Sequence, residues 1–445
     1  MKTKKTSPWA WIPTLYIAEG LPYFAVHVMT VLMYVNLGIS NAKMAFYTGW
    51  LYLPWVIKPF WSPFVDIIRT KRWWTLTMQF LIGISMASVA FLLPTSFFFA
   101  STLACFWLMA FFSATHDIAA DGYYMLELTA HEQAAYVGVR STFYRIASVI
   151  GQGGLIYLAG TLEKNLGDIP MAWSMTFAIL SIFFMVIWFY HTRMLPRAAA
   201  DVPRHEKNAR EIIRGFGETF TTFFRKPHIL TALAFMLLYR FPEAMCVKMV
   251  QPFLKASRDL GGLGLDTEQI GIINCVVGVI ALLLGGILGG LAIARNGLKR
   301  WLWPMALSLT LPCVFYCILA MTQPDNLFWI GSAVFVEQFG YGFGFTAFML
   351  YLIYFSRGEN KTSHYAFCTA FMALGMMLPG MAAGWIQEQL CAINIFGGSG
   401  NPGYINFFWW IILSCFATFA VCMCVHIDPH FGMKTHSDAD SDSAI

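Results

Sequence analysis

Two carboxylates and an imidazole lie within the segment FSATHDIAADGY, residues 112–123, whose other residues are mostly apolar or small. Asp117 and Asp121 are four residues apart, so on a helix they share one face at a separation of about 6 Å. Tyr124 continues that face, whereas His116 lies about 100° further round the helix. A carboxylate in an apolar setting beside a competing cation has a tunable pKa, as a proton carrier requires. Asp117 and Asp121 are therefore the first candidates for proton carriage.

Other ionisable side chains also interrupt the apolar runs, and they extend the set of candidates. Each costs at least about 2.5–3.5 kcal/mol at the centre of a membrane-spanning helix, so such residues usually mark transport pathways or proton relays. Glu19 and Glu337 are the second candidates for proton coupling, with hydrogen bonding to a neighbouring helix as the alternative. For the whole set, the alternative is permanent ion pairing that locks the helices together. The remaining groups are His27, Lys58, Arg140, Arg145, Arg240, Glu243 and Lys248.

Each aspartate has a basic residue at equal depth on the next segment, if the two segments form an antiparallel hairpin. The register pairs Asp117 with Arg145 and Asp121 with Arg140. The two arginines are five residues apart, which is about 140° round a helix. Both therefore cannot face the aspartates, and we expect one pair to be structural and the other to face a solute.

The basic residues also indicate the charge of a bound solute. Lys58, Arg145, Arg240 and Lys248 outnumber the acids available to neutralise them once any acid takes up a proton. Surplus positive charge suits a carboxylate or a phosphate ester. Together with Tyr124 and Tyr144, which offer hydroxyl groups and ring faces, these four residues are the candidate substrate-binding residues.

The composition predicts the environment of these groups. Of 445 residues, 58% are hydrophobic and 12% are charged, whereas soluble domains carry about 25% charged residues. Apolar runs long enough to cross a hydrocarbon core of about 30 Å recur along the chain, so we expect an all-α integral membrane protein with twelve transmembrane helices. Their predicted ranges are 9–36, 43–65, 73–93, 98–126, 135–160, 171–191, 228–254, 267–294, 301–321, 327–355, 362–390 and 406–427.

Basic residues are concentrated in the loops on one side of these spans, the side that holds both termini. Only Lys43, Lys164, Lys255 and Arg258 fall in loops on the other side. Because basic loops stay in the cytoplasm, both termini are predicted to be cytoplasmic. The net charge of +5 is thus a topology signal, and no nucleic-acid partner is expected.

A long basic segment divides the spans into two sets. We expect an N-terminal six-helix bundle at 1–191, a cytoplasmic linker at 192–227, a C-terminal six-helix bundle at 228–427 and a cytoplasmic tail at 428–445. This is the layout of the major facilitator superfamily, whose halves are related by internal repetition. The loops DIIRTKR and ARNGLKR resemble the signature loops of that superfamily, which implies an inward-side gating role for Asp66, Arg69 and Arg72. The alternative is that these basic residues only anchor the loop on the cytoplasmic side.

Other functional classes lack support in the sequence. No HExxH motif, GxSxG motif in a suitable setting or Cys/His ligand spacing is present, so neither an enzyme nor a metal or cofactor site is predicted. A receptor would need a sizeable soluble output domain, and the longest polar segment is the linker. We expect a monomer that binds a small-molecule anion and protons within a lipid bilayer.

Four blocks of the first 160 residues resemble the AmpG muropeptide permease family of the major facilitator superfamily. They are GLPY, LPWVIKPFWSPFVD, FFSATHDIAADGYYMLEL and GVRSTFYRIASVIGQGG. The resemblance implies proton-driven import of anhydro-muropeptides, sugar-peptide fragments of peptidoglycan, across a bacterial inner membrane. The family's charged and tyrosine positions in these blocks fall on Lys58, Asp66, Asp117, Asp121, Tyr144 and Arg145. His116 and Tyr124 depart from the residues common in the family at their positions.

The leading hypothesis is therefore a proton-coupled secondary transporter that imports an anionic, sugar-containing solute by alternating access. The alternative is a transporter of another anion, such as an acyl-CoA, a siderophore or a sugar phosphate, and an exporter uses the same parts.

Overall fold

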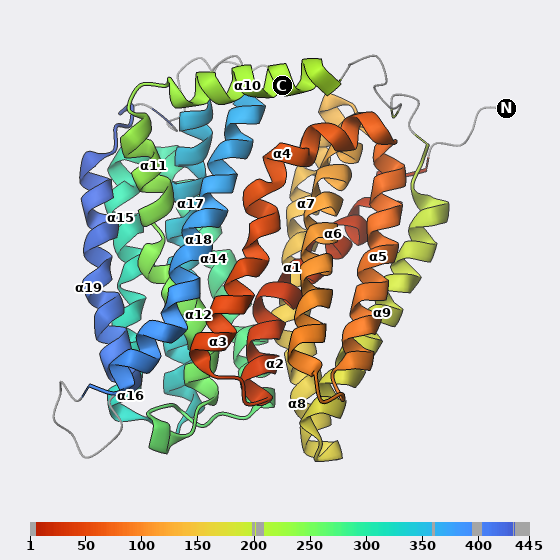
Figure 1. The fold of residues 1–445 in the computed structure, drawn as a ribbon. Helices are drawn as coiled ribbons and strands as arrows, with labels where there is room; N and C mark the ends of the chain where they lie inside the picture. The colour runs from red at the N-terminus through yellow and green to blue at the C-terminus, as the bar shows by residue number, and fades with distance from the viewer. Residues whose placement is uncertain are drawn as a thin grey trace. The chain divides into compact units, whose positions relative to one another are not determined.

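The computed structural model describes residues 6–197, 201, 209–357, 361–393, 403–429 and 431, and these are helical with short connections (Figure 1). No strand occurs among them, so the predicted all-α class is confirmed. Ten of the helical segments are long and apolar enough to cross a membrane. The predicted spans 43–65 and 135–160 are not among these ten.

The chain forms two compact units. Unit 1 comprises residues 1–216 together with Leu265–Cys275, and unit 2 comprises residues 217–264 and 276–445. The helix α10, Ala209–Phe224, contributes to both units.

Unit 1 contains the segment quoted first in the sequence, which lies in its longest helix, α6. Within this unit α5 packs against both α6 and α9, and α1 packs against α7 (Figure 1). Its helices are α1 (Ile12–Phe24), α2 (Thr30–Asn36), α3 (Asn41–Gly49), α4 (Leu53–Ile68), α5 (Lys71–Leu92), α6 (Phe98–Glu127), α7 (Ala130–Val149), α8 (Leu155–Leu166), α9 (Ile169–Met194) and α13 (Thr267–Ile272).

Two π-helical turns lie entirely within unit 1, and a third, Ile273–Gly278 (η6), follows α13. Residues Ala25–Met29 (η2) join α1 to α2, and Ile150–Gly154 (η4) joins α7 to α8. The turns contact each other, and a Cβ atom on Gly151 would lie 2.6 Å from Cβ of Phe24. A π-helical turn inserts a residue into an α-helix and is frequent at functional sites. The glycine-rich run GQGG thus allows close helix approach, as small residues do in membranes.

Helices of unit 2 also pack closely at glycine residues. A Cβ atom on Gly285 of α14 would lie 2.2 Å from the carbonyl oxygen of Phe339, and one on Gly342 of α17 would lie 2.3 Å from that of Leu282. Only glycine allows this separation of the two helix backbones. The helices are α11 (Ile229–Leu238), α12 (Phe241–Lys255), α14 (Val279–Asn296), α15 (Leu298–Thr310), α16 (Pro312–Thr322), α17 (Leu327–Ser356), α18 (Lys361–Cys391) and α19 (Gly403–Cys424).

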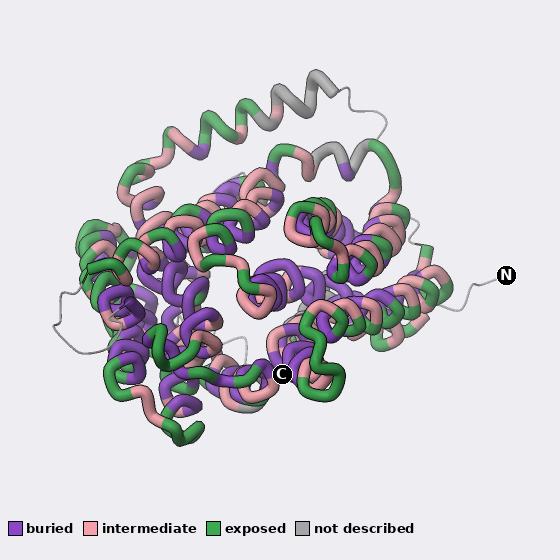
Figure 2. Tube along the Cα trace, turned by 60° about the horizontal axis from the view of Figure 1, so that its bottom comes forward, coloured by how far each residue is buried: buried purple, intermediate pink, exposed green. Residues whose placement is uncertain are grey.

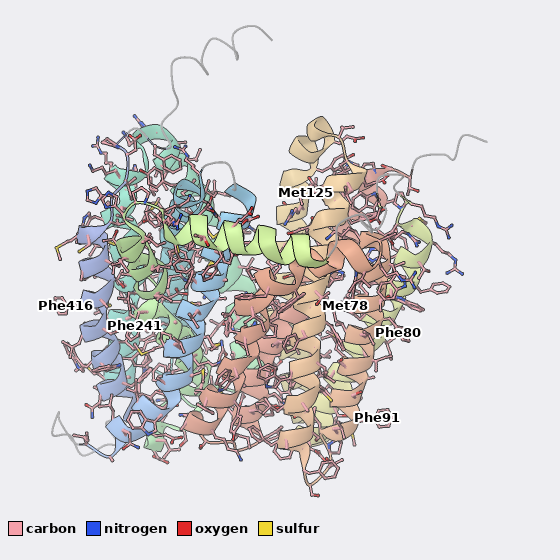
Figure 3. The ribbon with its side chains drawn as sticks, turned by 45° about the horizontal axis from the view of Figure 1, so that its top comes forward. Met78, Phe80, Phe91, Met125, Phe241 and Phe416 are labelled. Atoms are coloured by element: carbon pink, nitrogen blue, oxygen red, sulfur yellow. The ribbon has the colours of Figure 1, made fainter. Side chains whose placement is uncertain are left out.

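Large apolar side chains cover the outward faces of the helices. Phe91 of α5 is 84% exposed and Phe416 of α19 is 70% exposed, and both point away from their ribbons (Figure 3). The buried residues lie on the helix faces that meet other helices of the same unit (Figure 2). Apolar surface on this scale needs a lipid environment, and the protein is therefore a multi-pass membrane protein.

The short helix α13 packs closely on α8 within unit 1. A Cβ atom on Gly160 would lie 2.2 Å from the backbone nitrogen of Glu268, and one on Gly271 would lie 2.5 Å from that of Tyr157. Lys164 Nζ lies 2.5 Å from Glu268 Oε2 and 3.3 Å from Asp266 Oδ2. The hydrogen bond to Glu268 raises the pKa of the Lys164 amino group.

The Glu163 carboxylate fixes the same junction. It accepts hydrogen bonds from Asn36 Nδ2 at 2.6 Å, Trp173 Nε1 at 2.7 Å and Thr267 Oγ1 at 2.6 Å. These donors come from α2, α9 and α13. One carboxylate therefore joins α13 to three other helical segments of unit 1.

Replacing Gly160 with alanine should weaken the packing of α13, because the added Cβ atom meets backbone rather than a flexible side chain. Overpacking of this kind costs about 1–3 kcal/mol, which should speed amide hydrogen exchange in α13 by about 5- to 150-fold if its protection reports local opening. Hydrogen-exchange mass spectrometry would measure this. Gly154→Ala is the matched control, because its Cβ atom would meet nothing within 4 Å; equal exchange in the two variants would contradict the prediction.

Candidate functional site

Asp121 of α6 forms the ion pair predicted from the hairpin register. Its Oδ1 atom lies 2.7 Å from Arg140 Nη2 of α7 and accepts a hydrogen bond of 3.2 Å from the Tyr16 hydroxyl of α1. The Arg140 guanidinium also lies 4.6 Å from the ring centre of Tyr16 and 5.7 Å from that of Tyr124. Both charged side chains keep about a third of their surface exposed. Contacts from α1, α6 and α7 thus fix the positions of Asp121 and Arg140, and both side chains remain partly exposed.

Asp117 has different partners from those predicted. Its Oδ2 atom accepts a hydrogen bond of 3.0 Å from Trp55 Nε1 and lies 3.6 Å from Lys58 Nζ. Trp55 and Lys58 are three residues apart on α4 and therefore share a face. The predicted pair of Asp117 with Arg145 is absent from the described side chains. Arg145 lies too far round α7 from Arg140 to face α6 as well, and α4 supplies the cation instead.

Glu19 lies close to both pairs but belongs to neither. It is 7% exposed on α1, one turn from Tyr16. Its Oε2 atom has no hydrogen-bond partner among the described residues. The charged groups that act on it are those of the two pairs, Asp117, Asp121, Lys58 and Arg140. Three acids and two cations therefore form one cluster inside unit 1, which we call the acid cluster.

His116 lies outside the acid cluster, in a separate polar network. Its Nε2 atom is 3.0 Å from Gln79 Nε2, and Gln79 Oε1 is 2.9 Å from His191 Nδ1. His191 Nε2 is 2.8 Å from Thr14 Oγ1. The four side chains come from α6, α5, α9 and α1 and join these helices. The sequence did not indicate this network, because glutamine and a histidine near a helix end carry no distinctive spacing.

Four aromatic rings lie beside Asp117. The imidazole of His27 stacks on the ring of Tyr52 at a centroid distance of 3.8 Å, and lies 4.5 Å from Tyr23 and 5.0 Å from Trp55. Tyr23 and Trp55 meet edge to face at 5.5 Å. His27 is in the π-helical turn η2, and Tyr52 is in the 3₁₀ turn Trp50–Tyr52 (η3) that precedes α4. We call Tyr23, His27, Tyr52 and Trp55 the aromatic cluster.

We did not identify the aromatic cluster from the sequence. Its signals are the i, i+3 spacing of Tyr52 and Trp55 and the i, i+4 spacing of Tyr23 and His27, each of which is common in ordinary packing. Only the packing of α1 against the second span brings the two pairs together.

Tyr144, a candidate for substrate binding, lies where α7 packs on α1. Its ring centre is 6.0 Å from that of Phe24, and a Cβ atom on Gly20 would lie 3.3 Å from its carbonyl oxygen. Arg145 is half-buried on the same helix and has no ion pair with a described side chain. Among the described side chains of unit 1, Arg145 is therefore a half-buried cation without a counter-ion.

In unit 2 the cation Arg240 is neutralised locally. Its Nε and Nη2 atoms donate to Glu243 Oε2 at 2.5 Å and Oε1 at 2.7 Å. The guanidinium also lies 5.3 Å from the ring centre of Tyr341 and 4.8 Å from that of Phe345. This two-point contact neutralises the charge of Arg240 and also fixes the orientation of its guanidinium group.

Lys248 and Glu337, the other two predicted residues of unit 2, are also buried. Lys248 is 6% exposed and has no ion pair with a described residue. Glu337 accepts hydrogen bonds from Gln338 Nε2 at 2.8 Å and from the Tyr316 hydroxyl at 3.5 Å. The hydrogen-bond donors to Glu337 are thus neutral, whereas Lys248 is a buried cation without a counter-ion among the described residues.

The predicted gating residues lie at the start of α5. Arg72 donates to the carbonyl oxygens of Leu195 at 3.0 Å and Thr192 at 2.7 Å, both at the end of α9. The Asp201 carboxylate accepts the backbone N–H groups of Lys71 at 2.6 Å and Arg72 at 2.9 Å, which caps the helix. Arg69 is exposed beside Trp73, and the side chain of Asp66 lies outside the described residues.

Comparisons with known proteins agree with this architecture. Residues 14–380 match the model of the Major Facilitator Superfamily. The anhydromuropeptide permease of Escherichia coli strain K12 is 25% identical over 380 residues, which cover 84% of this chain and 73% of that protein. The putative transporter AmpG 4 of Rickettsia conorii is 24% identical over 375 residues, which cover 81% and 85% of the two chains.

Among solved structures, a D-xylose–proton symporter is similar in fold, with a TM-score of 0.67 at 12% sequence identity. The match covers 96% of this chain and 98% of that chain. The likeness extends along nearly the whole length of both chains. The family match is to a family of transporters, not of enzymes. The chain belongs to the Major Facilitator Superfamily, and it is a transporter with the fold of that family.

Proposed function

We propose that the protein is a proton-coupled importer of anhydro-muropeptides in a bacterial inner membrane. The observation that carries this proposal is the acid cluster, in which one buried and two partly buried acids share two cations beside half-buried aromatic rings. The names of the relatives support the class of solute, since one is an anhydromuropeptide permease and another a putative AmpG transporter. Both termini lie in the cytoplasm in this proposal, and the working form is a monomer.

Proton carriage is assigned to Asp117 and Asp121. Each carboxylate has one cationic partner and one neutral donor, so protonation releases Lys58 or Arg140 without removing all of its hydrogen bonds. The released cation can then bind a carboxylate of the solute. Protonation and anion binding therefore favour each other through the same side chain, which is the requirement for symport. Glu19 and Glu337 are the secondary proton sites.

The cations without counter-ions supply the rest of the anion recognition. Arg145 in unit 1 and Lys248 in unit 2 need a negative partner to offset the cost of their burial. The peptide carboxylates of a muropeptide, or the lactyl carboxylate where no peptide is attached, meet that need, and the aromatic rings suit its sugars. Transport of another anion, such as an acyl-CoA, a siderophore or a sugar phosphate, or transport in the export direction, is the alternative. Tyr124, Tyr144 and Arg240 position the groups around the solute, and Asp66, Arg69 and Arg72 form the inward-side gate.

Asp121→Asn should abolish proton-driven accumulation while leaving exchange of solute across the membrane, because an amide keeps the hydrogen-bonding shape but cannot carry a proton. The probe is labelled N-acetylglucosaminyl-anhydro-muramic acid in proteoliposomes, with and without an inward proton gradient. Loss of a coupling energy of about 1–3 kcal/mol should lower accumulation by about 5- to 150-fold.

The control for this substitution is Asp325→Asn, which changes a carboxylate that is 94% exposed and should accumulate the probe as the wild type does. No uptake by the folded wild-type protein would contradict the muropeptide proposal. Accumulation by Asp121→Asn at the wild-type level would instead remove Asp121 from the proton path.

Lys248→Gln should weaken binding of the anionic probe, because the variant loses a charge-assisted hydrogen bond worth about 1.5–3 kcal/mol. The same variant should bind a probe whose lactyl carboxylate has been converted to an amide as well as the wild type does, since the two changes remove the same interaction. Binding to purified protein would be measured calorimetrically. Arg258→Gln, which alters an exposed cation paired with Asp325, is the control. An equal loss for both probes would contradict a direct role of Lys248 in anion binding.

A further inference from the structure

The indole of Trp55 connects the aromatic cluster to the acid cluster. Its N–H group donates to Asp117 Oδ2 at 3.0 Å, and its ring packs against Tyr23 and His27. We propose that Trp55 is a positioning residue that couples the binding of a sugar ring on the aromatic cluster to proton uptake at Asp117. This inference rests on the proposed function and names the residue that links its two halves.

Trp55 makes the closest polar contact to Asp117. The Lys58 ammonium is 3.6 Å from the same oxygen atom, which is beyond good hydrogen-bond distance. Within the described part of the chain, the indole N–H is thus the best placed donor to this carboxylate. A displacement of the indole by a few tenths of an ångström therefore acts directly on Asp117.

The ring of Trp55 has little freedom on its other side. Tyr23 meets it edge to face at an interplanar angle of 90°, and His27 is held in turn by its stacked contact with Tyr52. Tyr23, Tyr52 and Trp55 are each only half-buried. A pyranose ring presents polarised C–H groups that pack on the negative face of an aromatic ring. A sugar that binds this surface contacts rings that pack against one another, so displacing one ring also displaces the others.

Such a displacement of the indole raises the proton affinity of Asp117, which is the direction that symport requires. A hydrogen bond to the charged form of a carboxylate favours that form, so tilting the N–H group away favours protonation of Asp117. The charged groups that face Asp117 are Lys58 of α4, Asp121 of its own helix, Glu19 of α1 and, beyond Asp121, Arg140 of α7. Protonation removes one negative charge from this set and frees Lys58 for the anionic part of the solute. The sugar and the proton thus bind together.

The test removes the N–H donor and keeps the ring. Trp55→Phe and Trp55→3-benzothienylalanine both lack the indole N–H, and the second keeps the size and shape of the bicyclic ring. The matched control is Trp61→Phe on the same helix, because the Trp61 N–H has no hydrogen-bond partner among the described residues. All variants and the wild type are assayed in proteoliposomes with labelled N-acetylglucosaminyl-anhydro-muramic acid, for exchange and for gradient-driven accumulation. Their affinity for this probe is also measured from pH 5 to pH 8, a range of about 3 units that spans physiological proton concentrations.

We expect the benzothienyl variant to exchange the probe as the wild type does, to lose about 5- to 150-fold in accumulation, and to bind the probe with little dependence on pH. Trp61→Phe should match the wild type in all three assays. Wild-type accumulation by the benzothienyl variant, or a parallel loss of exchange and accumulation, would overturn the inference, since Trp55 would then be dispensable or merely structural. Failure of the wild type to accumulate the probe at all is a different result, which would overturn the proposed function and the inference with it.

Discussion

An unpaired charge inside the hydrocarbon region is costly, and the pairing of the two aspartates of α6 constrains how unit 1 is assembled. Two aspartates one turn apart on α6 repel each other unless neighbouring helices bring cations to them. The protein supplies one cation from each side, Arg140 from α7 and Lys58 from α4. The positions of α4 and α7 are thus tied to the charges of α6 as much as to apolar packing.

Backbone features set the distances over which these pairs form. Glycines allow the helices to approach closely, as at Gly151, where an added Cβ atom would lie 2.6 Å from Cβ of Phe24. The π-helical turn η2 redirects the first span at His27, so that the ring reaches Tyr52 and Trp55. A regular α-helix would place the imidazole on a different face. The pairing of charges and the irregular backbone are therefore linked, because close helix contacts hold the charged groups and the aromatic rings in place.

Much of the fold could be predicted from hydropathy and basic loops, because a bilayer leaves few alternatives to the helix. The Asp121–Arg140 pair could also be predicted, since adjacent segments joined by a short turn have a known register. Asp117 with Lys58 could not, because α4 and α6 are not consecutive and no turn sets their relative depth. For the same reason, the aromatic cluster and the packing of α13 on α8 could be identified only from the structure. Long-range contacts between helices depend on tilt and on π-helical turns, which periodicity does not report.

The network of His116, Gln79 and His191 bears on whether protons can pass through unit 1 without solute. Imidazoles pass protons along when they are in direct contact or joined by water, since each ring can accept at one nitrogen and donate from the other. Here a carboxamide separates them, with Gln79 Nε2 toward His116 and Oε1 toward His191. An amide in that orientation has no proton to relay from its oxygen to its nitrogen side. The two histidines are thereby insulated from each other, and if the protein is coupled to protons as proposed, this network gives them no route through unit 1 that bypasses the solute.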